Sequence, residues 1–191
     1  MRFVTVFSLL IFSLTIFAAD TTRSFSYSSY EAAVKAATHL HFEMESTKAG
    51  IITTGFTGVV KKFDTTFVRQ GKAIQSGATI SFAVKDMDTD VDGRNEKMYT
   101  QCFSAKEYPT IKVQLGAPIT IGVAEQSYPA TINLRGAELP ITIRVTIKEV
   151  AEGILVSGNS NVTLSALKIP DPSIWIATVR DMVEIKFKLL L

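Results

Sequence analysis

The stretch DMDTDVDGRNEKMYTQCFSAKEYPTIKV (Asp86–Val113) is the most informative part of the sequence for predicting the fold. Aspartates occupy alternate positions from Asp86 to Asp92, and Gly93 follows directly. Residues 95–101 (NEKMYTQ) are typical of a short helix, and TIKV at the end alternates apolar and polar residues like a half-buried β-strand. The stretch therefore predicts a helical connection between two strands, and it raises the question of whether the aspartates bind an ion.

The aspartates match the beginning of a calcium-binding loop but not its end. The first, third, fifth and sixth positions of an EF-hand loop would be Asp88, Asp90, Asp92 and Gly93. The twelfth position, which needs a bidentate glutamate, is Tyr99, and the segment before the loop reads as a strand instead of a helix. The carboxylate that completes the oxygen shell is therefore missing.

A polar connection between strand and helix is the interpretation that fits this loop better. Asp92 or Gly93 leads into the helix, where acidic residues suit the N-terminal end. Arg94 is then expected to pair with one of the nearby aspartates. A calcium- or metal-stabilised structural or adhesive domain built on the Asp88-Asp90-Asp92 loop remains the alternative.

Alternating strand patterns extend in both directions from this stretch. They predict about eight strands, punctuated mostly by Gly, Pro, Asn or Asp, at residues 39–46, 55–60, 80–84, 110–115, 130–135, 141–148, 154–164 and 182–189. Residues 30–37 form a second helical island. One domain with this many long strands is expected to be an all-β antiparallel sandwich or a closed barrel, because closure removes exposed strand edges. An eight-stranded barrel can hold one small ligand.

The N-terminal residues predict export. Met1-Arg2 precedes an apolar run from Phe3 to Phe17, and Ala18-Ala19 follows, which is the pattern of a secretory signal peptide over residues 1–19. Residues 20–191 then form one domain by length. The formal net charge is only +2, and no basic patch suggests nucleic acid as a partner. No later apolar run reaches spanning length, so stable membrane insertion is not expected, and a homodimer is left open.

On these residues the chain resembles the YceI-like family of periplasmic proteins. The resemblance rests on Asp88-Thr89, Arg94, Met98, Phe103 and the Tyr108–Ile111 segment (YPTI) in that order. INLRGAELPITIRV (132–145), and THLHFEMES (38–46) followed by TGFTGVVKKFD (54–64), are similar to two further family segments. The resemblance implies an extended lipocalin-like barrel in the periplasm. Such a barrel would bind a polyisoprenoid or a similar long amphiphile, without catalysis.

The chain also departs from the family pattern at two places. Asn95 replaces the acidic residue usual after the arginine, and residues 164–168 (LSALK) replace a more polar segment before the last strand. These departures leave the expected fold unchanged, and the resemblance alone does not identify the ligand.

Neither histidine forms a convincing metal site. His39 and His41 alternate with Glu43 and Glu45 along one strand face, and they are the only histidines in the chain. A metal site here would need Glu43 or a distant carboxylate as its third ligand. A solvated outer face is the simpler interpretation, with the opposite face of the strand toward the interior.

Catalysis has equally little support. The chain has no G-x-S-x-G elbow, and its single cysteine, Cys102, is expected to be a buried small hydrophobe without a disulfide partner. The prediction is a protein that is not an enzyme, with no metal and no cofactor.

The segment KIPDPSIWIATVRD (168–181) contains the only tryptophan, Trp175. Pro170 and Pro172 exclude a regular central strand. The segment is interpreted either as an apolar lip that contacts a ligand tail or a membrane, or as a plug that closes one end of the core.

The cavity itself is predicted from alternation and from the helical island. The residues expected to line it are Phe42, Phe56, Ile80, Phe82, Val84, Met98, Phe103, Ile111, Val113, Ile143, Val145, Trp175 and Phe187. Such a wall suits an isoprenoid or fatty-acid-like lipid, because each buried CH₂ contributes about 0.8 kcal/mol. The leading hypothesis is an exported protein that holds a lipid for transport, storage or stress protection.

Overall fold

The computed structural model describes residues 20–191, so the expected signal peptide lies outside the described residues. The helical elements are α1 (Tyr30–Lys35), the 3₁₀ turn η1 (Val84–Asp86), α2 (Asp92–Lys97) and the π-helical turn η2 (Met98–Cys102). The strands are β1 (Thr21–Ser26), β2 (His39–Lys48), β3 (Ile52–Val60), β4 (Lys62–Phe67), β5 (Arg69–Gln70), β6 (Ala73–Ile74), β7 (Thr79–Ala83), β8 (Met87–Asp88), β9 (Thr110–Leu115), β10 (Ile119–Thr120), β11 (Gln126–Leu134), β12 (Ala137–Val150), β13 (Gly153–Thr163), β14 (Ala177–Val179) and β15 (Met182–Leu190).

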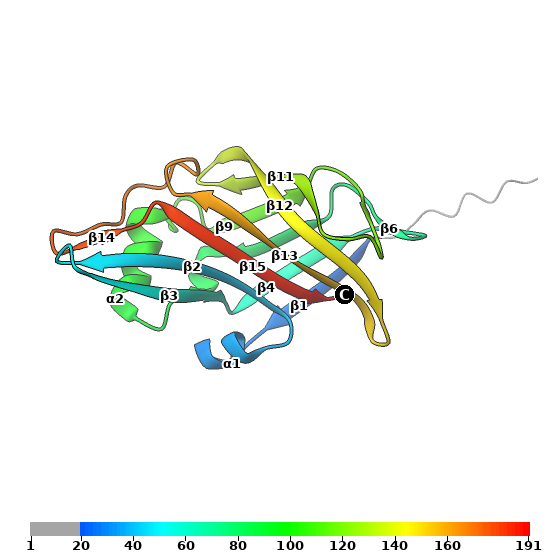
Figure 1. The fold of residues 1–191 in the computed structure, drawn as a ribbon, viewed down its shortest axis with the longest axis horizontal. Helices are drawn as coiled ribbons and strands as arrows, with labels where there is room; N and C mark the ends of the chain where they lie inside the picture. The colour runs from blue at the N-terminus through cyan, green and yellow to red at the C-terminus, as the bar shows by residue number, and fades with distance from the viewer. Residues whose placement is uncertain (1–19) are drawn as a thin grey trace, which may run out of the picture.

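One antiparallel sheet dominates the molecule and curls into a barrel-like shape (Figure 1). Its strand order is β1-β4-β7-β9-β11-β12-β13-β15-β2-β3-β8, with β14 paired to β2. The short strands β10, β6 and β5 form a separate three-stranded sheet. The all-β antiparallel class is confirmed, but the expected count of eight strands is wrong, since the main sheet alone has twelve.

The extra strands arise from breaks and from short additions. The eight predicted segments appear as β2, β3, β7, β9, β11, β12, β13 and β15, and β9 has the predicted bounds. Only Lys61 separates β3 from β4, and the turn η1 separates β7 from β8. The strands β1 and β4 were not predicted, and β14 forms after the two prolines of its loop.

Lys61 joins the two ends of the curled sheet. The strands β3 and β4 lie near opposite ends of the strand order, yet they follow each other directly along the chain. The Lys61 N–H donates to Asp86 O at 2.8 Å, and Lys61 O accepts from the Tyr27 N–H at 2.8 Å. The chain itself therefore connects the strand that pairs with β8 to the strand that pairs with β1.

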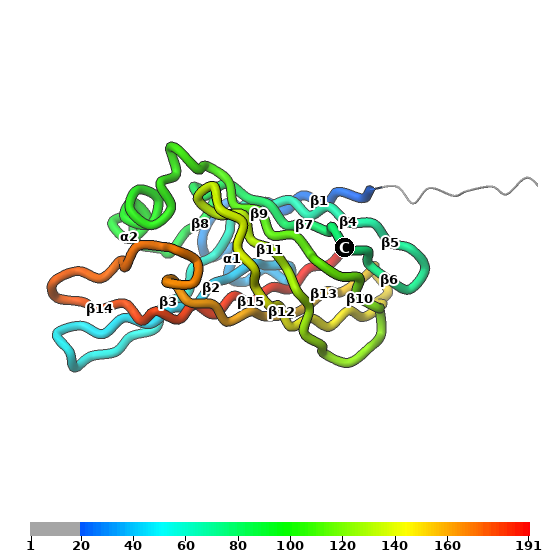
Figure 2. Tube along the Cα trace, turned by 90° about the horizontal axis from the view of Figure 1, so that it is seen from above, coloured from blue at the N-terminus to red at the C-terminus, as the bar shows by residue number. Residues whose placement is uncertain are grey.

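The helical connection of Asp86–Val113 lies at one end of the sheet (Figures 1 and 2). The helix α2 begins at Asp92, a few residues earlier than predicted, and continues into η2. Met98 and Cys102 are buried on this connection, and both belong to the main hydrophobic core. Burial of these two side chains holds the helical segment against the end of the sheet.

Candidate functional site

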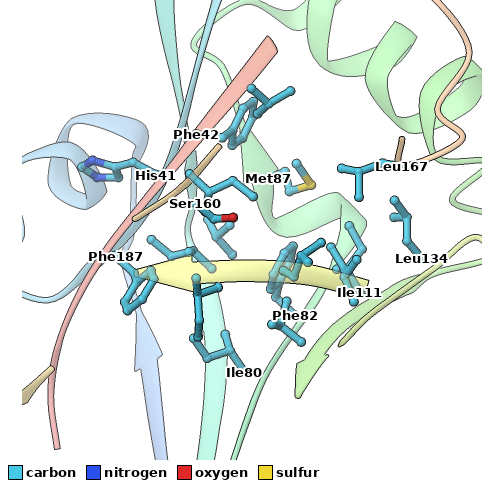
Figure 3. A pocket seen from close by; sticks show the side chains of 18 of the residues that line it. His41, Phe42, Ile80, Phe82, Met87, Ile111, Leu134, Ser160, Leu167 and Phe187 are labelled. Carbon is cyan, nitrogen blue, oxygen red and sulfur yellow. The ribbon is translucent and has the colours of Figure 1, made fainter. Parts of the chain in front are cut away.

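A deep cavity of about 560 Å³ lies inside the curled sheet. This volume is within the usual range of small-molecule pockets, about 300–1,000 Å³. Its wall is overwhelmingly apolar, and side chains from β2, β7, β9, β13 and β15 converge on it (Figure 3). The residues labelled in Figure 3 are His41, Phe42, Ile80, Phe82, Met87, Ile111, Leu134, Ser160, Leu167 and Phe187.

Strand alternation supplies this wall, as the strand patterns predicted. On β7 and β9 the cross-strand pairs Ile80–Val113 and Phe82–Ile111 all face the cavity. The alternation changes phase at Lys61. The even-numbered residues Phe56 and Val60 line the cavity from β3, whereas Thr65 and Phe67 are the buried lining residues of β4, and the half-buried Thr66 between them also reaches the lining. An apolar surface therefore continues across the break between these two strands.

The cavity brings together eleven of the thirteen predicted lining residues. These are Phe42, Phe56, Ile80, Phe82, Met98, Phe103, Ile111, Val113, Ile143, Val145 and Phe187.

Val84 and Trp175 do not line the cavity. Val84 is buried with 1% exposure, but β7 ends at Ala83 and η1 begins at Val84, whose N–H donates to Pro109 O. The alternation of β7 therefore ends one residue before Val84, and the predicted inward position of Val84 is wrong. Trp175 is 100% exposed, so it neither plugs the core nor contacts the cavity. Its neighbour Ile174 does line the cavity, so part of the loop forms a lip.

Two phenylalanines of the wall lie over glycines on neighbouring strands. Phe42 pairs with Gly58, and Phe187 pairs with Gly158. A Cβ added to Gly58 would lie 1.9 Å from Phe42 Cζ, and one added to Gly158 would lie 2.1 Å from Arg144 O and 2.5 Å from Phe187 Cζ. Glycine leaves room for the ring at Gly58, and for both the ring and the neighbouring carbonyl at Gly158.

The cavity wall contains two cationic side chains that alternation could not reveal. Arg94 and Lys97 are three residues apart on α2, which places them on neighbouring parts of one helix face. The Arg94 guanidinium lies 4.0 Å from the Phe56 ring centroid, and its Nη2 donates to Thr89 O at 2.7 Å. The Lys97 ammonium donates to the carbonyl oxygens of Pro172 and Ser173, which ties α2 to the loop before β14.

One donor of Arg94 is left without a partner. Among the described residues, Arg94 Nε is the buried side-chain polar atom that lacks a hydrogen bond. Burial lowers the pKa of Arg94 from its ordinary value, although an arginine remains charged at neutral pH. A buried donor without a partner is costly, so a polar group of a bound molecule would stabilise it.

The aspartate loop is a hydrogen-bonded network centred on Asp88 and Asn95. Asp88 Oδ2 pairs with Lys61 Nζ at 2.8 Å, and Asp88 Oδ1 accepts from Asn95 Nδ2 at 2.8 Å and from the Asp90 N–H at 2.9 Å. Asn95 Oδ1 accepts from the Thr89 hydroxyl at 2.6 Å and from the Thr89 N–H at 2.9 Å. An amide at position 95 can donate to Asp88, which a carboxylate could not do.

This network corrects the expected partner of Arg94. The cation paired with Asp88 is Lys61, whereas Arg94 bonds the Thr89 carbonyl. Burial acts to raise the pKa of Asp88, but the hydrogen bonds from Lys61, Asn95 and the Asp90 N–H outweigh it, and the pKa is lowered. Residues 20–191 contain no group of three or more His, Cys, Asp or Glu side chains placed to hold a metal ion.

The two histidines contact the α1 segment, which covers their face of β2. The expectation that this face is solvated is therefore wrong for the two histidines. His39 Nδ1 lies 2.9 Å from Ala36 O, and His41 Nε2 lies 3.3 Å from Ala33 O. The two rings stack with centroids 4.2 Å apart, and burial lowers the pKa of His41. In Figure 3 the His41 ring lies beside the α1 ribbon. Their role in the fold is to attach α1 to β2.

Cys102 lies in the cavity wall and is buried, as expected. Burial raises the pKa of its thiol. A thiol in this state is a poor nucleophile, because the thiolate is the reactive form.

The fold and the site together define a barrel-like β protein with one large internal apolar pocket. In the part of the chain that the structure describes, no helix is long and apolar enough to cross a membrane. The YceI-like domain family matches residues 32–191, and the chain belongs to this family.

Solved structures share this fold at low sequence identity. Burkholderia cenocepacia BcnA is similar with a TM-score of 0.62 and 19% identity, over 78% of this chain and 94% of that chain. A polyisoprenoid-binding domain from Saccharophagus degradans has a TM-score of 0.56 and 15% identity, over 80% of this chain and 91% of that chain. The Campylobacter jejuni YceI protein has a TM-score of 0.54 and 16% identity, over 69% of this chain and 83% of that chain. A search of curated proteins gave no significant match.

Proposed function

We propose that this protein binds a polyisoprenoid or a similar long amphiphile, with the apolar chain inside the cavity. The observation that carries the proposal is the 560 Å³ cavity, whose wall is formed almost entirely by apolar side chains. Transfer of an apolar chain from water to such a wall contributes about 0.8 kcal/mol per CH₂. Affinity is then expected to increase with chain length, and no single wall residue dominates it.

The polar end of the ligand would lie near Arg94 and Lys97. Both side chains reach the cavity from α2, and Arg94 Nε is a buried donor that lacks a partner. A hydroxyl, carbonyl or anionic group on the ligand would accept from this donor. The ligand class is therefore an amphiphile with one small acceptor group at the end of a long apolar chain.

The family and a structural neighbour support this proposal. The chain belongs to the YceI-like family, and the similar domain from Saccharophagus degradans is a polyisoprenoid-binding domain. We further propose that residues 1–19 are a signal peptide and that residues 20–191 function in the periplasm. Binding, for transport, storage or stress protection, and not catalysis, is the proposed activity.

Ligand uptake by the purified protein tests the proposal. Native mass spectrometry of the protein isolated from its host is expected to show a bound lipid. After lipid removal, the protein is expected to take up isoprenoid alcohols with an affinity that rises with chain length. A protein that carries no lipid and takes up none of these alcohols would overturn the proposal.

A matched pair of substitutions locates the binding site. Val113→Trp places a large side chain in the cavity, whereas Val91→Trp adds the same side chain at an exposed position. Only Val113→Trp is expected to weaken uptake of the longest alcohols, while both variants keep the circular dichroism of a folded β protein. Equal uptake by the two variants would place the ligand elsewhere.

A further inference from the structure

Five large apolar side chains project from two adjacent loop tips at one end of the molecule. They form what we call the apolar rim: Ile51 (86% exposed), Ile52 (62%), Ile174 (53%), Trp175 (100%) and Ile176 (47%). Isolated exposed apolar residues are ordinary on protein surfaces, whereas a contiguous group marks an interaction site. The rim therefore needs an explanation apart from the pocket.

The two tips form one structural unit. The strand β14 pairs with β2, with Ala177 opposite Lys48, and the Ala49 N–H donates to Ile176 O at 2.9 Å. Figures 1 and 2 both show the β2–β3 turn and the loop before β14 side by side at the same end of the molecule. The rim residues are therefore held together by backbone hydrogen bonds.

The two tips themselves carry no charge. Residues 49–54 and 172–179 include no Asp, Glu, Lys or Arg, and the charged residues Lys48, Asp171 and Arg180 lie at the borders of these ranges. Five side chains on two narrow tips are also far fewer than the roughly 20–30 residues that each side of a stable protein–protein interface contributes. Tryptophan and aliphatic side chains on a protruding, uncharged tip suit the boundary between lipid headgroups and acyl chains.

The rim continues into the wall of the cavity. Ile174 is exposed at the rim and also lines the cavity. Pro172 of the same loop and Ala177 of β14 line the cavity as well. Lys97 holds this loop to α2 through Pro172 O and Ser173 O. A surface that contacts the rim therefore lies directly against one end of the cavity.

We propose that the apolar rim docks the protein reversibly on the surface of a lipid bilayer, with Trp175 in the interface. Docking would bring the end of the cavity to the acyl chains, so that a ligand could move between bilayer and cavity without crossing water. The loading step rests on the proposed lipid-binding function, whereas the docking step does not.

Vesicle binding tests the docking step, with zwitterionic phosphatidylcholine vesicles as the probe. Trp175 is the only tryptophan, so its fluorescence reports on the rim directly. On addition of vesicles, the emission is expected to shift to shorter wavelength and to be quenched by lipids brominated on the acyl chain. Co-sedimentation with vesicles should change little between low and high salt, because the rim has no charge to screen.

Substitutions in the rim separate docking from folding. Ile51→Ser with Ile52→Ser is expected to weaken vesicle binding at least about tenfold, since burial of each isoleucine contributes more than the free energy that corresponds to a factor of ten. Val34→Ser, at another exposed apolar position on α1, should leave binding unchanged. Emission that vesicles do not alter, or equal binding by all variants, would overturn the proposal. Rim-dependent self-association without vesicle binding would also overturn it and would show that a second copy covers the rim.

The same variants distinguish failure of docking from failure of the proposed function. The rim variant should still take up an isoprenoid alcohol presented in detergent micelles, because neither Ile51 nor Ile52 lines the cavity. If the rim variant loses uptake of the alcohol from vesicles but keeps uptake from micelles, docking is supported as the loading step. Transfer from vesicles at the unaltered rate in the rim variant would contradict that step, even if micellar uptake occurs.

Discussion

The ring of Phe42 lies directly across Gly58 on the adjacent strand, so closely that a Cβ on Gly58 would be 1.9 Å from Phe42 Cζ. Gly58→Ala must therefore displace the ring from its position in the cavity wall. We expect this substitution to destabilise the protein by about 1–3 kcal/mol, as overpacking typically does. Chemical denaturation would measure the change in the free energy of unfolding.

Gly55 on the same strand provides the control for this prediction. A Cβ there would meet only Met44 O, at 3.8 Å, which is an ordinary contact. Gly55→Ala should therefore cost much less than Gly58→Ala. Equal effects of the two substitutions would contradict the role assigned to the Phe42 ring, because loss of glycine flexibility by itself stabilises a folded protein.

The lowered pKa of Asp88 predicts a loss of stability in acid. A carboxyl group whose pKa is lower in the folded protein contributes stability above its unfolded pKa, and this contribution disappears as pH falls through the folded value. Asp88 should therefore stabilise the fold fully above about pH 4, near the ordinary value for aspartate, and progressively less below it. Denaturation at several pH values would measure this dependence.

Asp88→Asn isolates the contribution of this residue. The substitution removes the charge that faces Lys61 and should cost about 1–3 kcal/mol at neutral pH. The stability difference from the unaltered protein should shrink as the pH is lowered. Asp64→Asn, at an exposed position on β4, is the control and should have little effect. A constant difference at every pH would contradict the role of Asp88.

Calcium should leave the melting temperature unchanged. Lys61, Asn95 and the Asp90 N–H already occupy the carboxylate oxygens of Asp88, and Tyr99 hydrogen-bonds to the Met87 carbonyl. A ligand that binds the folded state raises its stability by mass action. A rise in melting temperature with calcium that a chelator reverses would support the alternative of an ion-stabilised domain.

Arg94→Lys should separate recognition of the ligand head from binding of its chain. Lysine keeps the positive charge but lacks the Nε donor that has no partner in Arg94. Affinity for an isoprenoid alcohol is expected to fall about fivefold, the equivalent of one hydrogen bond of about 1 kcal/mol. Affinity for a hydrocarbon of the same length should be unchanged in a competition assay. An equal loss for both molecules would mean that Arg94 acts through packing on Phe56 alone.

Cys102 should react slowly with thiol reagents in the folded protein. Burial raises the pKa of its thiol, so the reactive thiolate forms only at higher pH than for an exposed cysteine. Because Cys102 lines the cavity, a bound lipid should slow the reaction further. The time course with an uncharged reagent, with and without ligand, would test both points, and denatured protein gives the rate for free access. Rapid reaction at neutral pH in the folded state would contradict this prediction.

The sequence predicted the wall of the cavity well because alternation has a simple physical cause. Most side chains that point into the cavity from a strand are apolar, and β9 shows this at Ile111 and Val113, which line the cavity as expected. The prediction failed at Val84, because a 3₁₀ turn ends the alternation.

The exposure of Trp175 and the two cations at one end of the cavity were not predicted from the sequence. Both features depend on tertiary contacts. The position of Trp175 follows from the pairing of β14 with β2, which links segments far apart in the sequence. Lys97 reaches the carbonyl oxygens of Pro172 and Ser173 only because the fold brings α2 to that loop. The spacing of Arg94 and Lys97 on a short helix was the one local signal that could have indicated a shared face.

The change of phase at Lys61 has a consequence for how this gene can tolerate changes in length. A single codon inserted within β4 would exchange inward and outward positions, and would turn Thr65 and Phe67 away from the cavity. Two inserted codons would preserve the alternation, and only the backbone hydrogen bonds at the end of β4 would be lost. Lys61 already acts as a single extra residue between β3 and β4. Its backbone N–H donates to Asp86 O, and its backbone carbonyl accepts from the Tyr27 N–H. Viable length variants of this region should therefore differ by even numbers of residues.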